Sequence, residues 1–276
     1  MALNLLTNQG GIPIFRTIFS IVSIVLLAIS TAYSDTGAVT SSAVEYKDGD
    51  VVLDGYISHN KATQGKSPAV IIVHDWMGVG DFTKEQSRRI AELGYVAFAA
   101  DIYGKGVRPK NADEAGKLAG KYKGDRKLMR ERIKAALDYV RTLDYVDTGR
   151  IAVIGYCFGG MVALELARDG ADIAGVASIH GGLDTPDSKS SKIKAKVLVL
   201  RGADDPFVPK EDVEALQKEL RASGVDWYMT AYGNAVHAYT NPKAGTDNSK
   251  GAAYNEKADK RSWVALKEFF KEIFSK

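Results

Sequence analysis

Short apolar runs rich in β-branched residues alternate along this chain with segments whose apolar residues recur at helical spacing. Ala69–Val73, Ile151–Ile154 and Val197–Leu200 are such runs, and they suit parallel strands that are buried on both faces of a sheet. Asp125–Arg141 and Glu211–Arg221 have the spacing of amphipathic helices. The alternation predicts a doubly wound, mostly parallel α/β sheet in a single domain, with ligands bound beyond the carboxyl ends of its strands.

Most of the remaining chain fits the same alternation. Gly104–Lys123 is the exception, because it is rich in glycine and lysine and has weak periodicity. We expect a loop and a loose helix there, either covering a site or serving as a solvated connector. Further strands are expected at Val51–Ile57, Tyr95–Ala100, Ile173–Ile179 and Trp227–Thr230, and further helices at Phe82–Leu93, Met161–Ala167 and Trp263–Phe274.

The N-terminal segment has the pattern of a secretory signal peptide. Arg16 precedes an apolar run from Ile18 to Ile29, and small residues follow around Ala32 and Ser34. The run is shorter than the ~20 residues that a membrane span needs. We therefore expect residues 1–34 to be removed and residues 35–276 to be exported as a periplasmic or secreted domain, without stable membrane association. The alternative is an uncleaved N-terminal anchor.

Charge, histidine spacing and cysteine content limit the classes of ligand and partner that we expect. The formal net charge is only +3 over 276 residues, and no Lys/Arg cluster has interleaved aromatics, so nucleic acid is not expected as a partner. The histidines do not fall in ligand-spaced pairs, and neither a metal nor another cofactor is implied. The single cysteine cannot form an internal disulfide. In an exported protein such a thiol is either buried and inert or used chemically.

The surroundings of that cysteine indicate a nucleophile. Cys157 lies in the segment Gly155–Gly159, which follows a predicted strand and precedes a predicted helix. Gly-x-nucleophile-x-Gly in this context is the nucleophile elbow of α/β-hydrolases, with cysteine in the usual serine position. The glycines allow close backbone passage, and the helix N-terminus favours a thiolate. The alternative is a buried structural cysteine beside glycine-rich packing.

Candidate partners follow in the order that hydrolase triads require, which is nucleophile, acid, histidine. Asp204 and Asp205 both lie in a loop after a predicted strand, and either could bond an imidazole. His237 lies in the loop after the last predicted strand. His74 and His180 also follow strands, but the first precedes the nucleophile and the second precedes the acid. Chain order therefore favours His237 as the base.

Five segments together resemble the dienelactone hydrolase family, and the resemblance extends from about Val70 to the C-terminus. It implies an α/β-hydrolase fold and a carboxylic ester or lactone hydrolase similar to carboxymethylenebutenolidase. It also assigns the acid to Asp205, which directly precedes a Pro-Phe-Val-Pro segment. The segments are His74–Gly78, Asp101–Tyr103, Gly155–Gly160, Asp205–Pro209 and His237–Tyr239.

The resemblance implies roles for three further residues around the thiol. The backbone N–H groups of Trp76 and Phe158 would form the oxyanion hole. Asp75 occupies the position of a family glutamate that contacts the resting thiol, so it would gate activation of Cys157. The alternative is that Asp75 only braces the loop that carries Trp76.

Two positions depart from the family. Lys105 and Asn241 stand where dienelactone hydrolases hold a substrate carboxylate with arginines. Lysine keeps the charge without the bidentate fork, and asparagine loses the charge. We expect both residues to contact substrate, and anionic substrates to lose part of their advantage over neutral esters.

These observations together predict a hydrolase that cleaves carboxylic esters or lactones. Cys157, His237 and Asp205 would act as nucleophile, base and orienting acid through a thioester acyl-enzyme. A small-molecule ester or lactone is the expected partner, and the sequence does not specify an oligomeric state. The alternatives are a non-catalytic binding protein on the same fold and a cysteine peptidase or acyltransferase.

Overall fold

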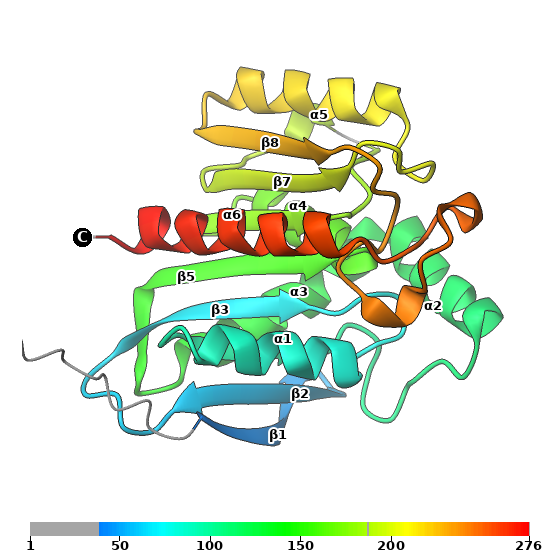
Figure 1. Cartoon of the computed structure of the whole chain (residues 1–276). Helices are drawn as coiled ribbons and strands as arrows, with labels where there is room; N and C mark the ends of the chain where they lie inside the picture. Colours follow the sequence, from blue (N-terminus) through cyan, green and yellow to red (C-terminus); the bar gives the residue numbers. More distant parts are fainter. Residues whose placement is uncertain (1–38, 187, 276) are drawn as a thin grey trace, which may run out of the picture. The chain divides into compact units, whose positions relative to one another are not determined.

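The computed structural model describes residues 39–186 and 188–275, which contain one eight-stranded sheet in the order β1-β2-β4-β3-β5-β6-β7-β8 (Figure 1). The predicted signal peptide, residues 1–34, lies outside the described residues. The strands are β1 (Val39–Asp48), β2 (Val51–Asn60), β3 (Ser67–Val73), β4 (Val96–Ala100), β5 (Val146–Tyr156), β6 (Gly175–Ile179), β7 (Lys196–Gly202) and β8 (Trp227–Tyr232). The helices are α1 (Asp81–Ala91), α2 (Ala112–Gly124), α3 (Arg126–Arg141), α4 (Phe158–Arg168), α5 (Lys210–Ser223) and α6 (Glu256–Phe274), with 3₁₀ turns η1 (Ser188–Ser190), η2 (Pro242–Ala244) and η3 (Asn248–Lys250).

The sheet is mostly parallel, as the sequence predicts. From β4 through β3, β5, β6 and β7 to β8, every neighbouring pair of strands is parallel. β1 and β2 form an antiparallel hairpin, and β2 joins β4 in antiparallel register. The sequence did not predict β1, because this edge strand has one buried residue, Tyr46, and lacks an apolar run.

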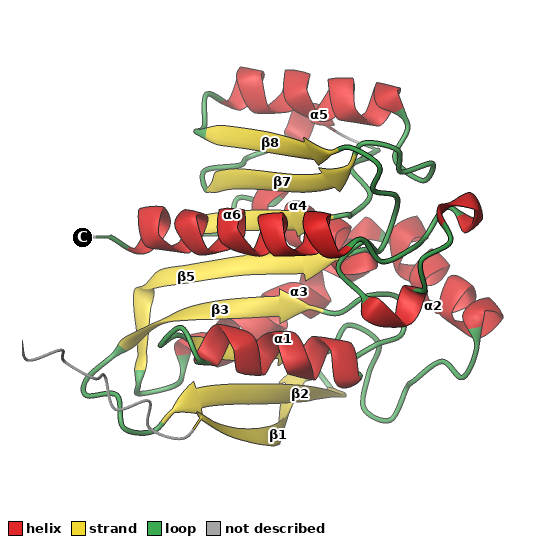
Figure 2. Cartoon of the chain, viewed as in Figure 1, coloured by secondary structure: helices red, strands yellow, loops and turns green. Residues whose placement is uncertain are grey.

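Alternate residues of β3 build a core on each face of the sheet. Ile71 and Val73 pack in a buried cluster that contains residues of α3, α4 and α5. Val70 and Ile72 pack in a second cluster with residues of α1 and α6. Figure 2 shows these two helices in front of the sheet, with α3 and α4 behind it. Truncating one such aliphatic side chain to alanine costs roughly 2–5 kcal/mol, so both layers hold the central strands in place.

The carboxyl ends of the parallel strands meet at one edge, where their connecting loops gather (Figures 1 and 2). The helix α2 also lies at this edge, and it is the helix that we expected, together with a loop, across 104–123. Its N-cap is Asn111, whose side chain accepts the N–H of Glu114. Within the described residues, no helix has both the length and the apolar character to cross a bilayer.

Candidate active site

Cys157 sits at a sharp turn between β5 and α4, with φ +56° and ψ −117°. A Cβ on Gly155 would lie 1.9 Å from the carbonyl oxygen of Gly159, and a Cβ on Gly159 would lie 2.3 Å from that of Val73. Only glycine fits such close backbone contacts. The two glycines therefore pack the turn against the end of β3, and the left-handed backbone at the cysteine is held by its surroundings.

His237 and Asp205 lie in line with the thiol. His237 Nε2 is 2.9 Å from Cys157 Sγ, and its Nδ1–H donates to Asp205 Oδ2 at 2.9 Å. The other carboxylate oxygen of Asp205 accepts the N–H of Phe207 at 2.9 Å, and the Asp205 side chain is fully buried. Asp204 is exposed. The structure thus brings Asp205, rather than its neighbour, to the histidine.

The electrostatics of this line favour a protonated His237. Burial alone would lower the pKa of His237, but the charge of Cys157 and the hydrogen bond that His237 donates to Asp205 outweigh it and raise the pKa to about 10. The imidazole therefore carries a proton at neutral pH, and Nε2–H points at Sγ. An imidazolium beside a cysteine favours the thiolate form that acts as a nucleophile.

The loop after β3 supplies the second side of the site. Trp76 and Phe158 line the same cavity as Cys157. Phe158 is the first residue of α4, where N–H groups have no intrahelical acceptor. The hydroxyl of Tyr103 donates to the carbonyl of Trp76 at 3.0 Å and so holds that peptide unit. The placement suits two backbone donors for an oxyanion, and sequence reasoning had not identified Tyr103 as their support.

Asp75 braces this loop. Its Oδ1 accepts the N–H of Met77 at 2.8 Å. Burial raises the pKa of Asp75, while the Met77 hydrogen bond and the charge of His237 act in the opposite direction. Among the described residues, no hydrogen bond joins the Asp75 carboxylate to Cys157. The observed contact is that of the bracing alternative, and the gating role stays a prediction.

The rival histidine His74 is also part of the brace. Its Nδ1–H donates to the carbonyl of Asp75 at 2.5 Å, and its Nε2 accepts the N–H of Ile102 at 3.1 Å. Burial lowers the pKa of His74 to about 4, so the ring is neutral. His74 thus fastens the loop to the end of β4. The other rival, His180, is buried beside Cys157 at the end of β6.

A cavity of about 780 Å³ opens over the thiol. Trp76, Met77 and Phe207 line it, and they are 39%, 36% and 60% exposed. These apolar side chains therefore lie where the cavity opens to solvent. Asn241 lines it too, while its side-chain oxygen accepts the N–H of Lys243 at 3.0 Å. Lysines come from α2, η2 and η3. They are Lys123, Lys243 and Lys250.

Lys105 is not among the residues that line this cavity. Its ammonium group forms an ion pair with Glu45 of β1, and it is about half exposed. The sequence had placed Lys105 at the substrate by analogy with a family arginine. The structure does not bring it there, and we leave it out of the proposed site.

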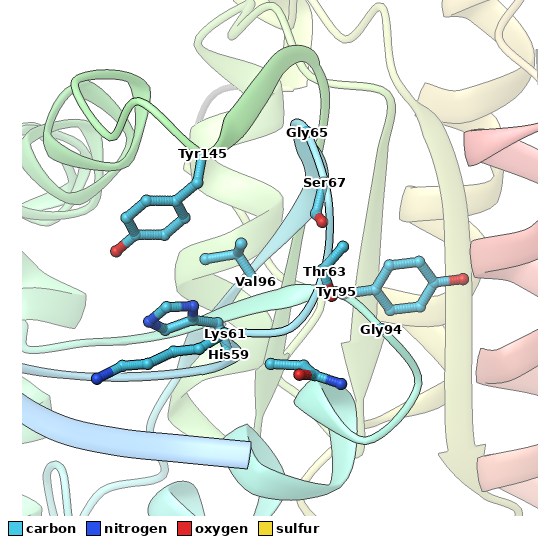
Figure 3. A pocket seen from close by; sticks show the side chains of 10 residues that line it. His59, Lys61, Thr63, Gly65, Ser67, Gly94, Tyr95, Val96 and Tyr145 are labelled. Carbon is cyan, nitrogen blue, oxygen red and sulfur yellow. The ribbon is translucent and has the colours of Figure 1, made fainter. Parts of the chain in front are cut away.

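A second cavity of about 350 Å³ lies at the opposite, amino-end edge of the sheet (Figure 3). His59 stacks on Tyr145 there, with ring centroids 4.8 Å apart and planes inclined by 11°. Burial and the charge of Lys61 lower the pKa of His59. Across 39–186 and 188–275, no group of three or more His, Cys, Asp or Glu is placed to hold a metal ion.

Comparisons with known proteins bear on the family and fold of this chain. The model of the dienelactone hydrolase family matches residues 53–274. A solved structure named m3DLH is 38% identical with a TM-score of 0.83, covering 87% of this chain and all of the other. A dienelactone hydrolase-like promiscuous phosphotriesterase from metagenomic libraries is 39% identical with the same TM-score and coverage. A provisionally named carboxymethylenebutenolidase of Aquifex aeolicus is 28% identical over 83% of this chain and 96% of its own length. The chain therefore belongs to the dienelactone hydrolase family and is a hydrolase with the α/β-hydrolase fold that its sequence predicts.

Proposed function

We propose that this protein hydrolyses carboxylic esters or lactones through a thioester on Cys157. The observation that carries the proposal is the hydrogen-bonded line from Cys157 Sγ through His237 to Asp205 at the base of an apolar cavity. All three side chains are chemically competent for nucleophilic acyl transfer.

The reaction follows from this arrangement in two steps. The Cys157 thiolate attacks the carbonyl carbon, and the oxyanion accepts the N–H groups of Trp76 and Phe158. Two such donors contribute roughly 3 kcal/mol each to the transition state. The C–O bond to the alcohol breaks, and the His237 imidazolium gives its proton to the departing alkoxide. His237 then takes a proton from water, which attacks the thioester; the C–S bond breaks, and Cys157 is a thiolate again.

The apolar part of the cavity wall suits neutral esters, and three lysines also line the cavity. Trp76, Met77 and Phe207 present exposed apolar surface around the thiol. Asn241 supplies no charge at the position where dienelactone hydrolases have an arginine, and Lys105 forms an ion pair with Glu45. We expect short neutral aryl esters to be hydrolysed, without a strong preference for dienelactone over all of them.

A substrate panel tests the proposal. Activated aryl esters, lactones and peptides are incubated with the wild type and with Cys157→Ala. The proposal predicts release of acid and alcohol from esters or lactones by the wild type, and loss of that activity in the variant. Cleavage of peptides alone would favour a peptidase, and turnover of nothing would favour a binding protein. Undiminished ester hydrolysis by Cys157→Ala would remove the thiol from the mechanism.

Phosphotriesters belong in the same panel. The similar solved structure from metagenomic libraries is described as a promiscuous phosphotriesterase, and the cavity here is apolar and roomy. A thiolate can also attack phosphorus: the P–O bond to the aryl group breaks, the His237 imidazolium gives its proton to the departing aryloxide, and water that has lost a proton to His237 then breaks the S–P bond. We propose slow hydrolysis of paraoxon as a second activity of the same site, and its absence in Cys157→Ala would link the two.

We also propose that the enzyme is exported. Arg16, the apolar run that follows it and Ala32–Ser34 support this. Intact mass of the protein from its native host would then lack the first thirty-odd residues. A full-length chain in the membrane fraction would contradict export by cleavage.

A further inference from the structure

His180 is a buried histidine to which the proposed reaction gives no part. It follows β6 and is 2% exposed. Its φ of +40° lies in the left-handed region, which is strained for a non-glycine residue. A buried and strained imidazole persists only where its surroundings determine its position. The contacts of His180 therefore identify the groups that fix its position and the groups that it positions.

Both ring nitrogens of His180 are engaged. Nδ1 accepts the backbone N–H of Cys157 at 3.2 Å, and the same N–H also donates to the carbonyl of Ile179 at 3.0 Å. Nε2 lies 2.8 Å from the hydroxyl oxygen of Thr240. Because Nδ1 is an acceptor, the proton is on Nε2 and is donated to Thr240. The ring thus joins the backbone of the nucleophile to a buried hydroxyl three residues after His237.

Sheet topology explains why such a link is useful. Cys157 follows β5 and His237 follows β8, and β6 and β7 lie between these two strands. The catalytic pair therefore depends on loops that no shared strand pairing holds together. His180 stands at the end of β6, within the gap, and its two hydrogen bonds run from one loop to the other.

The environment keeps His180 in the acceptor form that the link requires. Burial and the charge of His237 lower its pKa well below the usual value. The titratable rings that contact it are Tyr156, His237 and Tyr239, at centroid distances of 5.9, 5.4 and 5.2 Å. His180 is thus neutral beside a protonated His237, and its Nδ1 stays free to accept.

We propose that His180 and Thr240 are positioning residues that set the separation between Cys157 Sγ and His237 Nε2. The proposal rests on the proposed function, since it assigns these two groups to the reacting pair. Neither positioning residue exchanges a proton with substrate. Their effect is to hold two strained loops, at Cys157 and at Ala238, in register.

Thr240→Val tests the link with little change of shape. A single hydrogen bond at a reacting pair changes rates by up to about tenfold. We expect about a tenfold fall in kcat/KM for p-nitrophenyl butyrate, carried by kcat with KM unchanged. The rate of iodoacetamide alkylation of Cys157 at pH 7 should fall by a similar factor. Thr240→Ser keeps the hydroxyl and should retain at least about half of both rates.

Thr40→Val is the matched control. Thr40 also donates a side-chain hydrogen bond to a histidine residue, the carbonyl of His59, but at the amino-end edge of the sheet. Both rates should stay within about twofold of the wild type, because the loss of one partly buried hydrogen bond at β1 does not affect the pair.

His180→Asn tests the other half of the link. Asparagine tolerates the left-handed backbone, and its side-chain oxygen can still accept the Cys157 N–H, but it is too short to reach Thr240. We expect the loss seen in Thr240→Val, and no further loss in the double variant, because both changes break one connection. If thermal unfolding shows that one variant is not folded, the other variant serves as the test.

Three outcomes would overturn the link: unchanged rates in Thr240→Val, losses that multiply in the double variant, or a serine variant as impaired as the valine one. Failure of the proposed function is distinguishable from these. It would appear as ester hydrolysis that is absent in the wild type or retained in Cys157→Ala. Alkylation of the thiol needs no hydrolysis and still reports on the link in either case.

Discussion

The two cavities lie at opposite ends of one mostly parallel sheet, and histidines line both: His59 at one end, His180 and His237 at the other. At the amino-end cavity, His59 is held by stacking on Tyr145, with no side-chain hydrogen bond among the described residues. At the carboxyl-end cavity, His237 is fixed at both ring nitrogens by Cys157 and Asp205. Both ends of the sheet therefore have a cavity lined by aromatic side chains and histidine. Only the carboxyl-end cavity, among the described residues, has a histidine hydrogen-bonded to both a cysteine and an aspartate.

Backbone strain separates the two ends in the same way. Every non-glycine residue with positive φ in the described part of the chain lies in a loop that follows a strand at the carboxyl-end edge. Strain of this kind persists where the surrounding structure over-determines it, and such places are often functional. These residues are Cys157, His180, Asn234 and Ala238.

Replacing one histidine from each cavity, His237 and His59, gives the largest expected contrast. His237→Ala removes the base, and general acid–base groups contribute about 10²–10⁴-fold. We expect ester hydrolysis to fall by about a thousandfold. His59→Ala should leave the rate within about twofold, since His59 has no contact with the reacting groups. Equal losses in steady-state assays of the two variants would erase the distinction between the ends.

The neighbouring acids give the next contrast. Asp205→Asn keeps the size of the side chain but weakens the hydrogen bond that orients His237, so we expect about a hundredfold loss of kcat. Asp204→Asn should change kcat by less than about twofold, because Asp204 is exposed. The reverse order in the same assay would mean that the acid has been assigned to the wrong neighbour.

The pH dependence of thiol alkylation should show a smaller effect. The pKa of His237 is raised to about 10, so the ring is protonated below that pH and loses the proton above it. Between pH 7 and pH 9 the alkylation rate of Cys157 should therefore change by less than about threefold, whereas an unpaired thiol gains more than about tenfold. A steep rise over this interval would contradict a protonated His237 beside the thiol.

The same profile for Asp75→Asn separates gating from bracing. If Asp75 holds the thiol protonated, the variant reaches half-maximal alkylation at lower pH while turnover falls. If Asp75 braces the loop through Met77, the profile stays in place and the loss appears in turnover or thermal stability. An unchanged or upward-shifted profile rules out the gate.

Lysine substitutions should have the smallest effects. Lys105→Ala should not alter kcat/KM for neutral or anionic aryl esters, because its ammonium group faces Glu45. Lys250→Ala, within the cavity lining, should lower kcat/KM by about two- to threefold for an anionic ester only, as expected for one exposed charge. A selective loss for anionic esters in Lys105→Ala would restore the role that the family resemblance assigns to it.

Sequence reasoning reached the parallel sheet and the contacts of Cys157, His237 and Asp205 because local signals carry them. Buried parallel strands are continuous apolar runs, and a nucleophile elbow needs glycines such as Gly155 at fixed offsets. The order of residues along the chain then narrowed the histidines to one.

The rest depended on contacts between segments distant in sequence. The edge strand β1 lacks an apolar run, so it was missed, and with it Glu45, the partner that holds Lys105 away from the cavity. From the sequence, His74 and His180 could be interpreted only as alternative candidates for the base. Their hydrogen bonds to Ile102 and Thr240 form between segments that come together only in the folded sheet.

The most direct test of the central claim is to identify the residue that carries the acyl group. Wild-type enzyme is mixed with p-nitrophenyl butyrate, quenched in acid within milliseconds, digested and examined by peptide mass spectrometry. The account predicts a butyryl group on the peptide that contains Cys157, removable by hydroxylamine as a thioester is, and absent in Cys157→Ala. A butyryl group on a different residue, together with full turnover by Cys157→Ala, would contradict it.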